Sequence, residues 1–162
     1  MFISLIDVRF GTDCSDCGLM PFFMFGYEVN TFTVAIVGIL HMALGYLWYA
    51  PSMFGRQWMR GAGISADQMT ELQSHGVKRS ALLALFSSLT TAYVLAVIIG
   101  IMGFTGLAYG AVTGLLVWAG FLATSQLGPV LWEGRPMSLF AVNAGYHLVA
   151  LVLMGAVLGV WG

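Results

Sequence analysis

The sequence predicts an all-α fold, an integral membrane bundle of four helices. Its six basic and seven acidic residues are confined to positions 1–28, 56–79 and 133–135, so long stretches carry no charge. Charged residues make up 8% of the chain and hydrophobic residues 59%, whereas soluble proteins carry about 25% charged residues. Lipid is the solvent that accommodates so much apolar surface.

Four segments are long enough to cross a hydrocarbon core of about 30 Å, which takes about 20 helical residues. We expect these spans at residues 31–50, 80–103, 107–127 and 138–161. Pro51 and Pro129 should end the first and third spans, because proline lacks the N–H that continues a helix. The second and third spans are separated by residues 104–106 alone. We therefore expect these two to be antiparallel neighbours.

The basic residues predict the orientation of the bundle. The loops at 51–79 and 128–137 hold five of the six, and Arg9 is the one on the opposite side. By the positive-inside rule both loops are cytoplasmic and both termini extracytoplasmic, in what we expect to be the bacterial cytoplasmic (inner) membrane. The lipid bilayer is the expected partner. The sequence leaves undecided whether the protein forms a homo-oligomer. A net charge of -1 gives no reason to expect nucleic acid.

Residues 1–28 read as an N-terminal tail and residues 29–162 as the four-helix membrane domain. Short apolar runs in the tail alternate with Gly, Asp and Cys, so we expect it to add little stability. Either a disordered tail or a true start at Met20 or Met24 accounts for it. Cys14 and Cys17 supply half of a zinc site or, outside the cell, a local disulfide. We expect no metal and no cofactor.

The first cytoplasmic loop should contain a short helix of its own. Residues 65–68, Ser-Ala-Asp-Gln, form a capping box that opens a helix to about residue 74. We expect Met69 and Leu72 to face the membrane while the acidic residues face water. The segment is either a solvated connector or a regulatory element.

The two cytoplasmic turns resemble each other in sequence. Residues 51–56 read Pro-Ser-Met-Phe-Gly-Arg, and residues 129–135 read Pro-Val-Leu-Trp-Glu-Gly-Arg, with Glu133 as an insertion. Each turn joins an inward span to an outward one. This suggests a duplicated two-helix hairpin. Chance, or the shared chemistry of the membrane interface, is the alternative.

Two segments also resemble a known family. Residues 45–59 (GYLWYAPSMFGRQWM) are similar to the first-hairpin motif of the DUF1761 family, and residues 132–136 with Asn143-Ala-Gly-Tyr-His147 resemble its last helix. The similarity spans roughly residues 29–161. It implies a small four-span membrane protein of unknown function and supplies no catalytic residues. The cytoplasmic turn motifs comprise Trp48, Tyr49, Pro51, Phe54, Gly55, Glu133 and Arg135.

Two histidines lie within the expected spans. His41 and His147 are each nine residues from a cytoplasmic end, which places both about 13 Å deep. Asn143 is one turn from His147 on the same face, as Gly45 is from His41. We predict a midplane polar site of His41, Asn143 and His147, facing the bundle interior within direct or water-bridged reach. These groups either bridge helices by hydrogen bonds or form a proton, ion or ligand site.

Small-residue motifs mark two further helix faces. Gly110 and Gly114, and likewise Gly155 and Gly159, are spaced four apart, as in closely packed membrane helices. They serve packing within the monomer or between subunits.

Three classes of function follow from these features. The sequence favours a small transport, permeation or ligand-binding protein that uses the midplane site. The alternative is a membrane scaffold or accessory subunit in which the polar groups only fix packing. An enzyme using Glu133, Arg135 and His147 is the third class. We expect no enzyme, because the sequence contains no Ser-His-Asp, Cys-His or HExxH arrangement.

Overall fold

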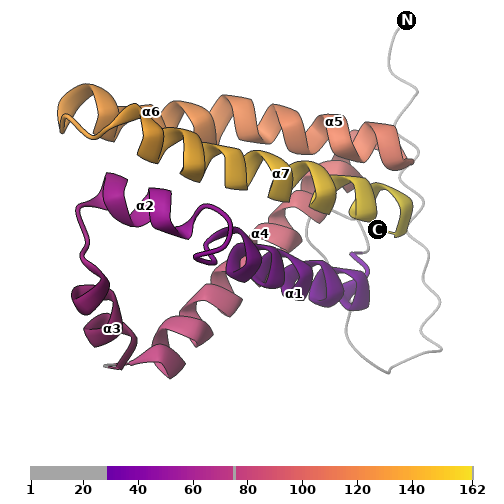
Figure 1. The fold of residues 1–162 in the computed structure, drawn as a ribbon. Helices are drawn as coiled ribbons and strands as arrows, with labels where there is room; N and C mark the ends of the chain where they lie inside the picture. Colours follow the sequence, from indigo (N-terminus) through magenta and orange to yellow (C-terminus); the bar gives the residue numbers. More distant parts are fainter. Residues whose placement is uncertain (1–28, 75, 162) are drawn as a thin grey trace, which may run out of the picture.

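A computed structural model describes residues 29–74 and 76–161, which contain helices and turns but no strand. Four helical segments are long and apolar enough to cross a membrane. They are α1 (Thr31–Trp48), α4 (Val77–Met102), the continuous α5–η1–α6 (Leu107–Val117, Trp118–Ala123, Thr124–Trp132) and α7 (Met137–Trp161) (Figure 1). The predicted all-α bundle of four spans is confirmed.

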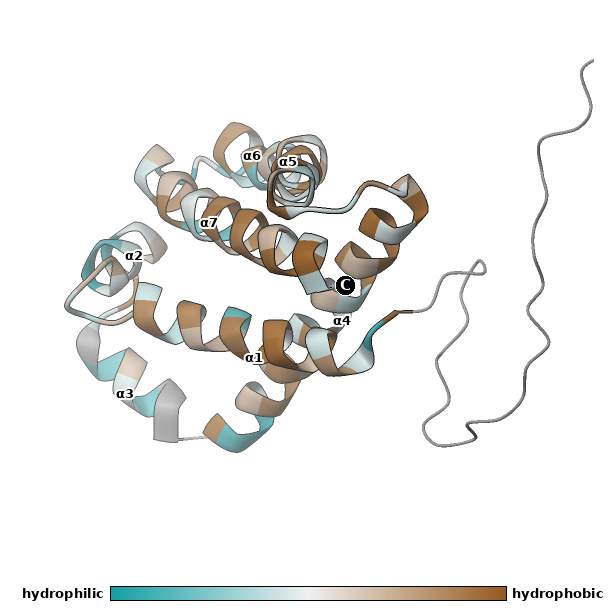
Figure 2. Ribbon diagram, turned by 90° about the vertical axis from the view of Figure 1, so that its right-hand side faces the viewer, coloured by the Kyte–Doolittle hydropathy of each residue, from teal (hydrophilic) through white to brown (hydrophobic). Residues whose placement is uncertain are grey.

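Helix α7 occupies the centre of the bundle. It lies between α5 and α6 on one side and α1 on the other, and α4 crosses obliquely beneath it (Figure 2). Val37 of α1, Leu95 of α4, and Leu151 and Leu158 of α7 are almost completely buried. The core therefore forms where α1, α4 and α7 meet.

Helices α5 and α7 approach so closely that their backbones touch. A Cβ on Gly110 would overlap the Gly155 carbonyl, and one on Gly155 would overlap the Gly110 carbonyl. The Gly106 N–H donates to the Gly159 carbonyl at 2.6 Å, so the two helices share a backbone hydrogen bond. The glycine motifs thus pack against each other within one chain.

The expected end of the third span at residue 127 is wrong, because α6 continues through Pro129 to Trp132. Membrane helices tolerate an internal proline where local π turns and hydroxyl side chains rearrange the backbone hydrogen bonds. Here the π-helical turn η1 lies just upstream, and the Thr124 hydroxyl donates to the Gly120 carbonyl at 2.8 Å. The Pro129 carbonyl then accepts N–H groups of the following turn, from Glu133 and Arg135.

The expectation that the second and third spans are close neighbours holds only near their connection. From the short link after Met102, α4 and α5 diverge (Figure 1). α4 packs mainly on α1, while α5 packs on α7. A short link fixes where two helices start, and the glycine contacts with α7 decide where α5 goes.

The loop between α1 and α4 contains two helices, α2 (Gly55–Ala62) and α3 (Ala66–Ser74). The predicted capping box is present: the Gln68 N–H donates to Ser65 Oγ, and the Ser65 N–H donates to Gln68 Oε1. Helix α2 was not predicted; its Gly61 lies against Leu139 of α7. The tail at 1–28 and the Leu72 side chain lie outside the described residues.

The charged residues among those described lie on α2, α3, the start of α4 and the α6–α7 turn. These elements lie at one end of the bundle, and hydrophilic residues colour parts of the ribbon there (Figure 2). The basic ones among the charged residues are Arg56, Arg60, Lys78, Arg79 and Arg135. Which side of the membrane this end faces stays a prediction, and reporter fusions to the C-terminus would test it.

Candidate functional site

The contact between α1 and α7 is built around the Tyr146 ring. Its hydroxyl donates to the backbone carbonyl of His41 at 3.2 Å. Its ring stacks on the His41 imidazole with centroids 5.5 Å apart and planes 14° apart. Gly45 leaves the space for this, since a Cβ there would lie 3.0 Å from the Tyr146 hydroxyl oxygen. Tyr146 therefore fixes both the main chain and the ring of His41.

His147 lies beside the same phenol ring. Its imidazole centroid is 4.9 Å from that of Tyr146, at 57° between the planes. Both histidines are half-buried, so neither is sealed inside the bundle nor fully exposed. The structure thus places the two predicted histidines on one aromatic ring, and their role stays a prediction.

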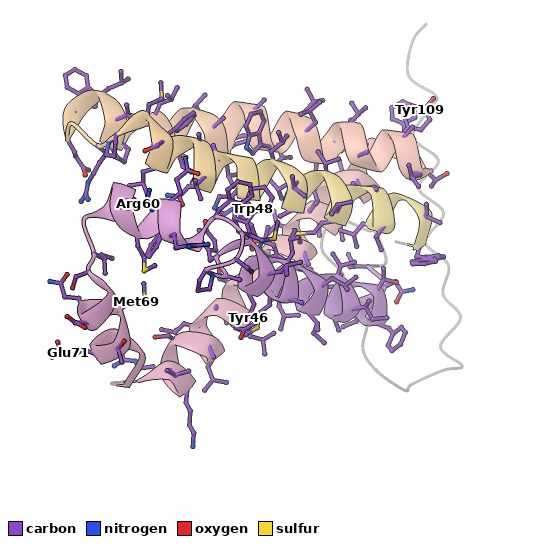
Figure 3. The ribbon with its side chains drawn as sticks, in the orientation of Figure 1. Tyr46, Trp48, Arg60, Met69, Glu71 and Tyr109 are labelled. Carbon is purple, nitrogen blue, oxygen red and sulfur yellow. The ribbon has the colours of Figure 1, made fainter. Side chains whose placement is uncertain are left out.

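Asn143, the third predicted site residue, joins α7 to the end of α1. Its side-chain oxygen accepts the Tyr49 hydroxyl at 3.1 Å. One residue earlier, the Trp48 indole N–H donates to the Val142 carbonyl at 3.1 Å. Figure 3 shows Trp48 on the α7 side of α1 and Tyr46 on the opposite side. The first turn motif and the midplane residues therefore form one continuous contact.

The two turn motifs have different backbones despite their similar sequences. After Pro51, the Gly55 N–H donates to the Ala50 carbonyl at 3.1 Å, and a Cβ on Gly55 would overlap the Tyr49 carbonyl. Phe54 packs on Trp48 with ring centroids 4.6 Å apart. In the second turn, Gly134 instead adopts the left-handed region, with φ 66°. The motifs do not share a conformation, and duplication stays a prediction.

Glu133 and Arg135 form an exposed ion pair in the second turn. Arg135 Nε lies 3.5 Å from Glu133 Oε2, and both side chains are about half exposed. Surface pairs of this kind contribute little stability. Among the described residues, neither side chain of this pair forms a hydrogen bond or ion pair with His147, the third residue of the enzyme interpretation.

A groove between α1 and α7, the α1–α7 groove, has a volume of about 410 Å³. Ten of the described residues line it, and among them His41 alone has a polar side chain. His41 Nδ1 is buried and has no hydrogen-bond partner among the described residues. The apolar lining is Val37, Leu40, Ala43, Leu44, Leu47, Ala150, Leu153, Met154 and Val157.

In the comparison with known proteins, one family model matches the chain. The family model for a protein of unknown function, DUF1761, matches residues 32–159. The chain belongs to the DUF1761 family. No curated protein and no solved structure matches it. The resemblance seen in the sequence is thereby confirmed, and the α1–α7 contact of this DUF1761 protein lies within the matched region.

Sequence reasoning missed Tyr146 and the groove. Tyr146 belongs to the family motif and directly precedes His147, and a tyrosine far from both ends of a span needs a partner for its hydroxyl. That signal was available. The groove had no sequence signal, because it depends on how far α1 and α7 stand apart. Within the described part of this DUF1761 chain, no three His, Cys, Asp or Glu side chains come together as metal ligands.

Proposed function

We propose that this protein binds a neutral, lipophilic small molecule that enters the α1–α7 groove from the bilayer. The observation that carries the proposal is His41, whose side chain lines an otherwise apolar groove and whose buried Nδ1 has no hydrogen-bond partner within residues 29–74 and 76–161. An imidazole nitrogen can donate or accept one hydrogen bond. A ligand with a single hydroxyl or carbonyl group would provide the missing partner.

The size and lining of the groove support a lipophilic ligand. Its volume of about 410 Å³ falls in the range of small-molecule sites, about 300–1,000 Å³. None of the described residues that line it is charged. An ionised ligand would have to leave water without an opposite charge to meet it, which is strongly unfavourable. Neutral molecules with one polar head fit this environment best.

The position of the opening supports entry from the membrane. Leu40 and Leu47 on α1 and Leu153 on α7 line the groove and are each more than half exposed. All three lie within helices long and apolar enough to span a membrane, so their exposed sides would meet hydrocarbon. Because the groove opens sideways, its geometry favours binding over permeation from one face to the other.

A scaffold function is supported by a different observation. Trp48, Tyr49 and Tyr146 all direct their polar atoms at α1 or α7, where they hold the two helices together. In a scaffold, the role of His41 would be limited to packing. The two functions differ in what should happen when the groove is filled.

Photolabelling in lipid vesicles separates the two functions. The probe is a long-chain alcohol that carries a diazirine, and labelled peptides are located by mass spectrometry. We expect label on the 40–47 and 150–157 segments, reduced at least fivefold by Leu153→Trp, which fills the groove, and by His41→Leu. Leu116→Trp, on an exposed position of α5, is the matched control and should leave labelling unchanged. Equal labelling of all four proteins would favour the scaffold.

A further inference from the structure

A second, smaller pocket lies between α6 and α7, apart from the α1–α7 groove. It has a volume of about 80 Å³ and contains three polar side chains, Gln126, Arg135 and Asn143. Apolar residues, among them Pro129 and Phe140, form the rest of its wall. The pocket therefore combines polar and apolar side chains at the charged end of the bundle.

Gln126 presents an acceptor that nothing in the described chain satisfies. Its Oε1 atom is buried without a hydrogen-bond partner, a state that is unfavourable unless a donor fills the site. Asn143 uses its side-chain oxygen for the Tyr49 hydroxyl, which leaves its amide N–H groups as donors. The pocket wall thus includes side chains with an acceptor and with donors, as a hydroxyl group requires.

Arg135 supplies positive charge to the pocket wall. A guanidinium carries five N–H donors, and in the described chain Arg135 uses Nε alone, toward Glu133 at 3.5 Å. Its side chain is 48% exposed. The donors on its terminal nitrogens are therefore available to a phosphate, which arginine binds in a fork geometry.

The level of Arg135 in the bundle points to a lipid. It stands in the short turn between the end of one apolar span, at Trp132, and the start of the next, at Met137. That position is the height of lipid headgroups. The described residues at this end include five basic and three acidic side chains, so anionic headgroups are attracted to it.

We propose that this pocket binds the headgroup of an anionic phospholipid bearing hydroxyl groups, with the phosphate on Arg135 and a hydroxyl on Gln126 and Asn143. The apolar part of the wall accommodates the first carbons of the lipid. A simple oxyanion would satisfy Arg135 but would leave the Gln126 acceptor without a donor.

Native mass spectrometry of the purified full chain in neutral detergent tests this. The probes are phosphatidylglycerol, phosphatidylmethanol, which has equal charge but no headgroup hydroxyl, and soluble glycerol 1-phosphate. We expect at least fivefold tighter binding of phosphatidylglycerol than of phosphatidylmethanol, and no competition from millimolar glycerol 1-phosphate. Competition by the soluble compound would overturn the lipid assignment.

Four variants assign the effect to the pocket. Arg135→Gln should weaken both lipids at least fivefold, and Gln126→Leu should abolish the preference for phosphatidylglycerol alone. Lys78→Gln, at the same charged end but outside the pocket, should change either affinity less than twofold. Equal losses in Arg135→Gln and Lys78→Gln would show diffuse attraction and overturn the site. If Arg135→Gln or Gln126→Leu does not fold, Val130→Trp provides the same test. Its side chain fills the pocket and should weaken the binding of both lipids.

Discussion

Helix α7 meets its two neighbours in opposite ways. On the α5 side, glycines bring the backbones into contact, and Gly106 and Gly159 share a main-chain hydrogen bond. On the α1 side, large aromatic side chains hold the helices together through hydrogen bonds, with Tyr146 at the centre.

The difference teaches where this protein has room to bind anything. Backbone contact in the α5–α7 seam leaves no space for a ligand, so that seam fixes the shape of the bundle. Side chains in the α1–α7 contact hold the helices apart and leave the groove of about 410 Å³. We therefore expect substitutions in the seam to affect stability, and those in the groove to affect binding.

The largest effect is expected in the α5–α7 seam. Gly110→Ala places a methyl group against the Gly155 carbonyl, and such overpacking destabilises a core by about 3 kcal/mol or more in tight sites. Thermal unfolding in detergent should show a large loss of stability or no folded protein. Gly120→Ala, where a Cβ meets nothing within 4 Å, is the control. Similar stability of both variants would contradict the close backbone contact between α5 and α7.

A smaller loss is expected on the α1 side. Trp48→Ala removes ring packing on Phe54 and the hydrogen bond to the Val142 carbonyl, and we expect about 2 kcal/mol of destabilisation for this partly buried ring. Tyr46→Ala two residues away, 87% exposed, should change stability by less than about 0.5 kcal/mol. The difference in unfolding temperature between the Trp48→Ala and Tyr46→Ala variants measures the stabilisation by the Trp48 contacts. Equal unfolding temperatures would argue against those contacts.

The Tyr49–Asn143 hydrogen bond should give a modest coupling. A double-mutant cycle with Tyr49→Phe and Asn143→Ala isolates it. Interhelical hydrogen bonds in membranes average about 0.6 kcal/mol and reach about 1.7 kcal/mol, so the coupling in unfolding free energy should fall in that range. Zero coupling would mean that the two side chains do not meet in the membrane.

The smallest effect on stability is expected at His41. Its Nδ1 has no hydrogen-bond partner in the part of the chain that the structure describes, and exchanging an unpaired buried polar group for an apolar one of similar size is close to neutral. His41→Leu should therefore unfold within about 1 kcal/mol of the wild type while losing the photolabel in the groove. Clear destabilisation without any change in labelling would instead assign His41 to the scaffold.

Much of the fold could be predicted because it depends on local patterns. Apolar runs without charge located the four spans, and Ser65 and Gln68 marked the start of α3. The end of the third span was misplaced because the helix continues through Pro129 to Trp132, downstream of a π-helical turn at Trp118–Ala123. The proline itself gave no signal that the helix would continue.

The sequence by itself predicted four apolar helices long enough to span a membrane, the grouping of the charges of residues 29–161 at one end, two glycine faces, and two histidines at equal distances from that end. The tertiary structure alone decided that the glycine faces meet each other, that both histidines flank Tyr146, and that a groove remains beside His41. The physical reason is that helical periodicity defines the face on which a residue lies. The partner of that face depends on crossing angles and distances set by all the helices together.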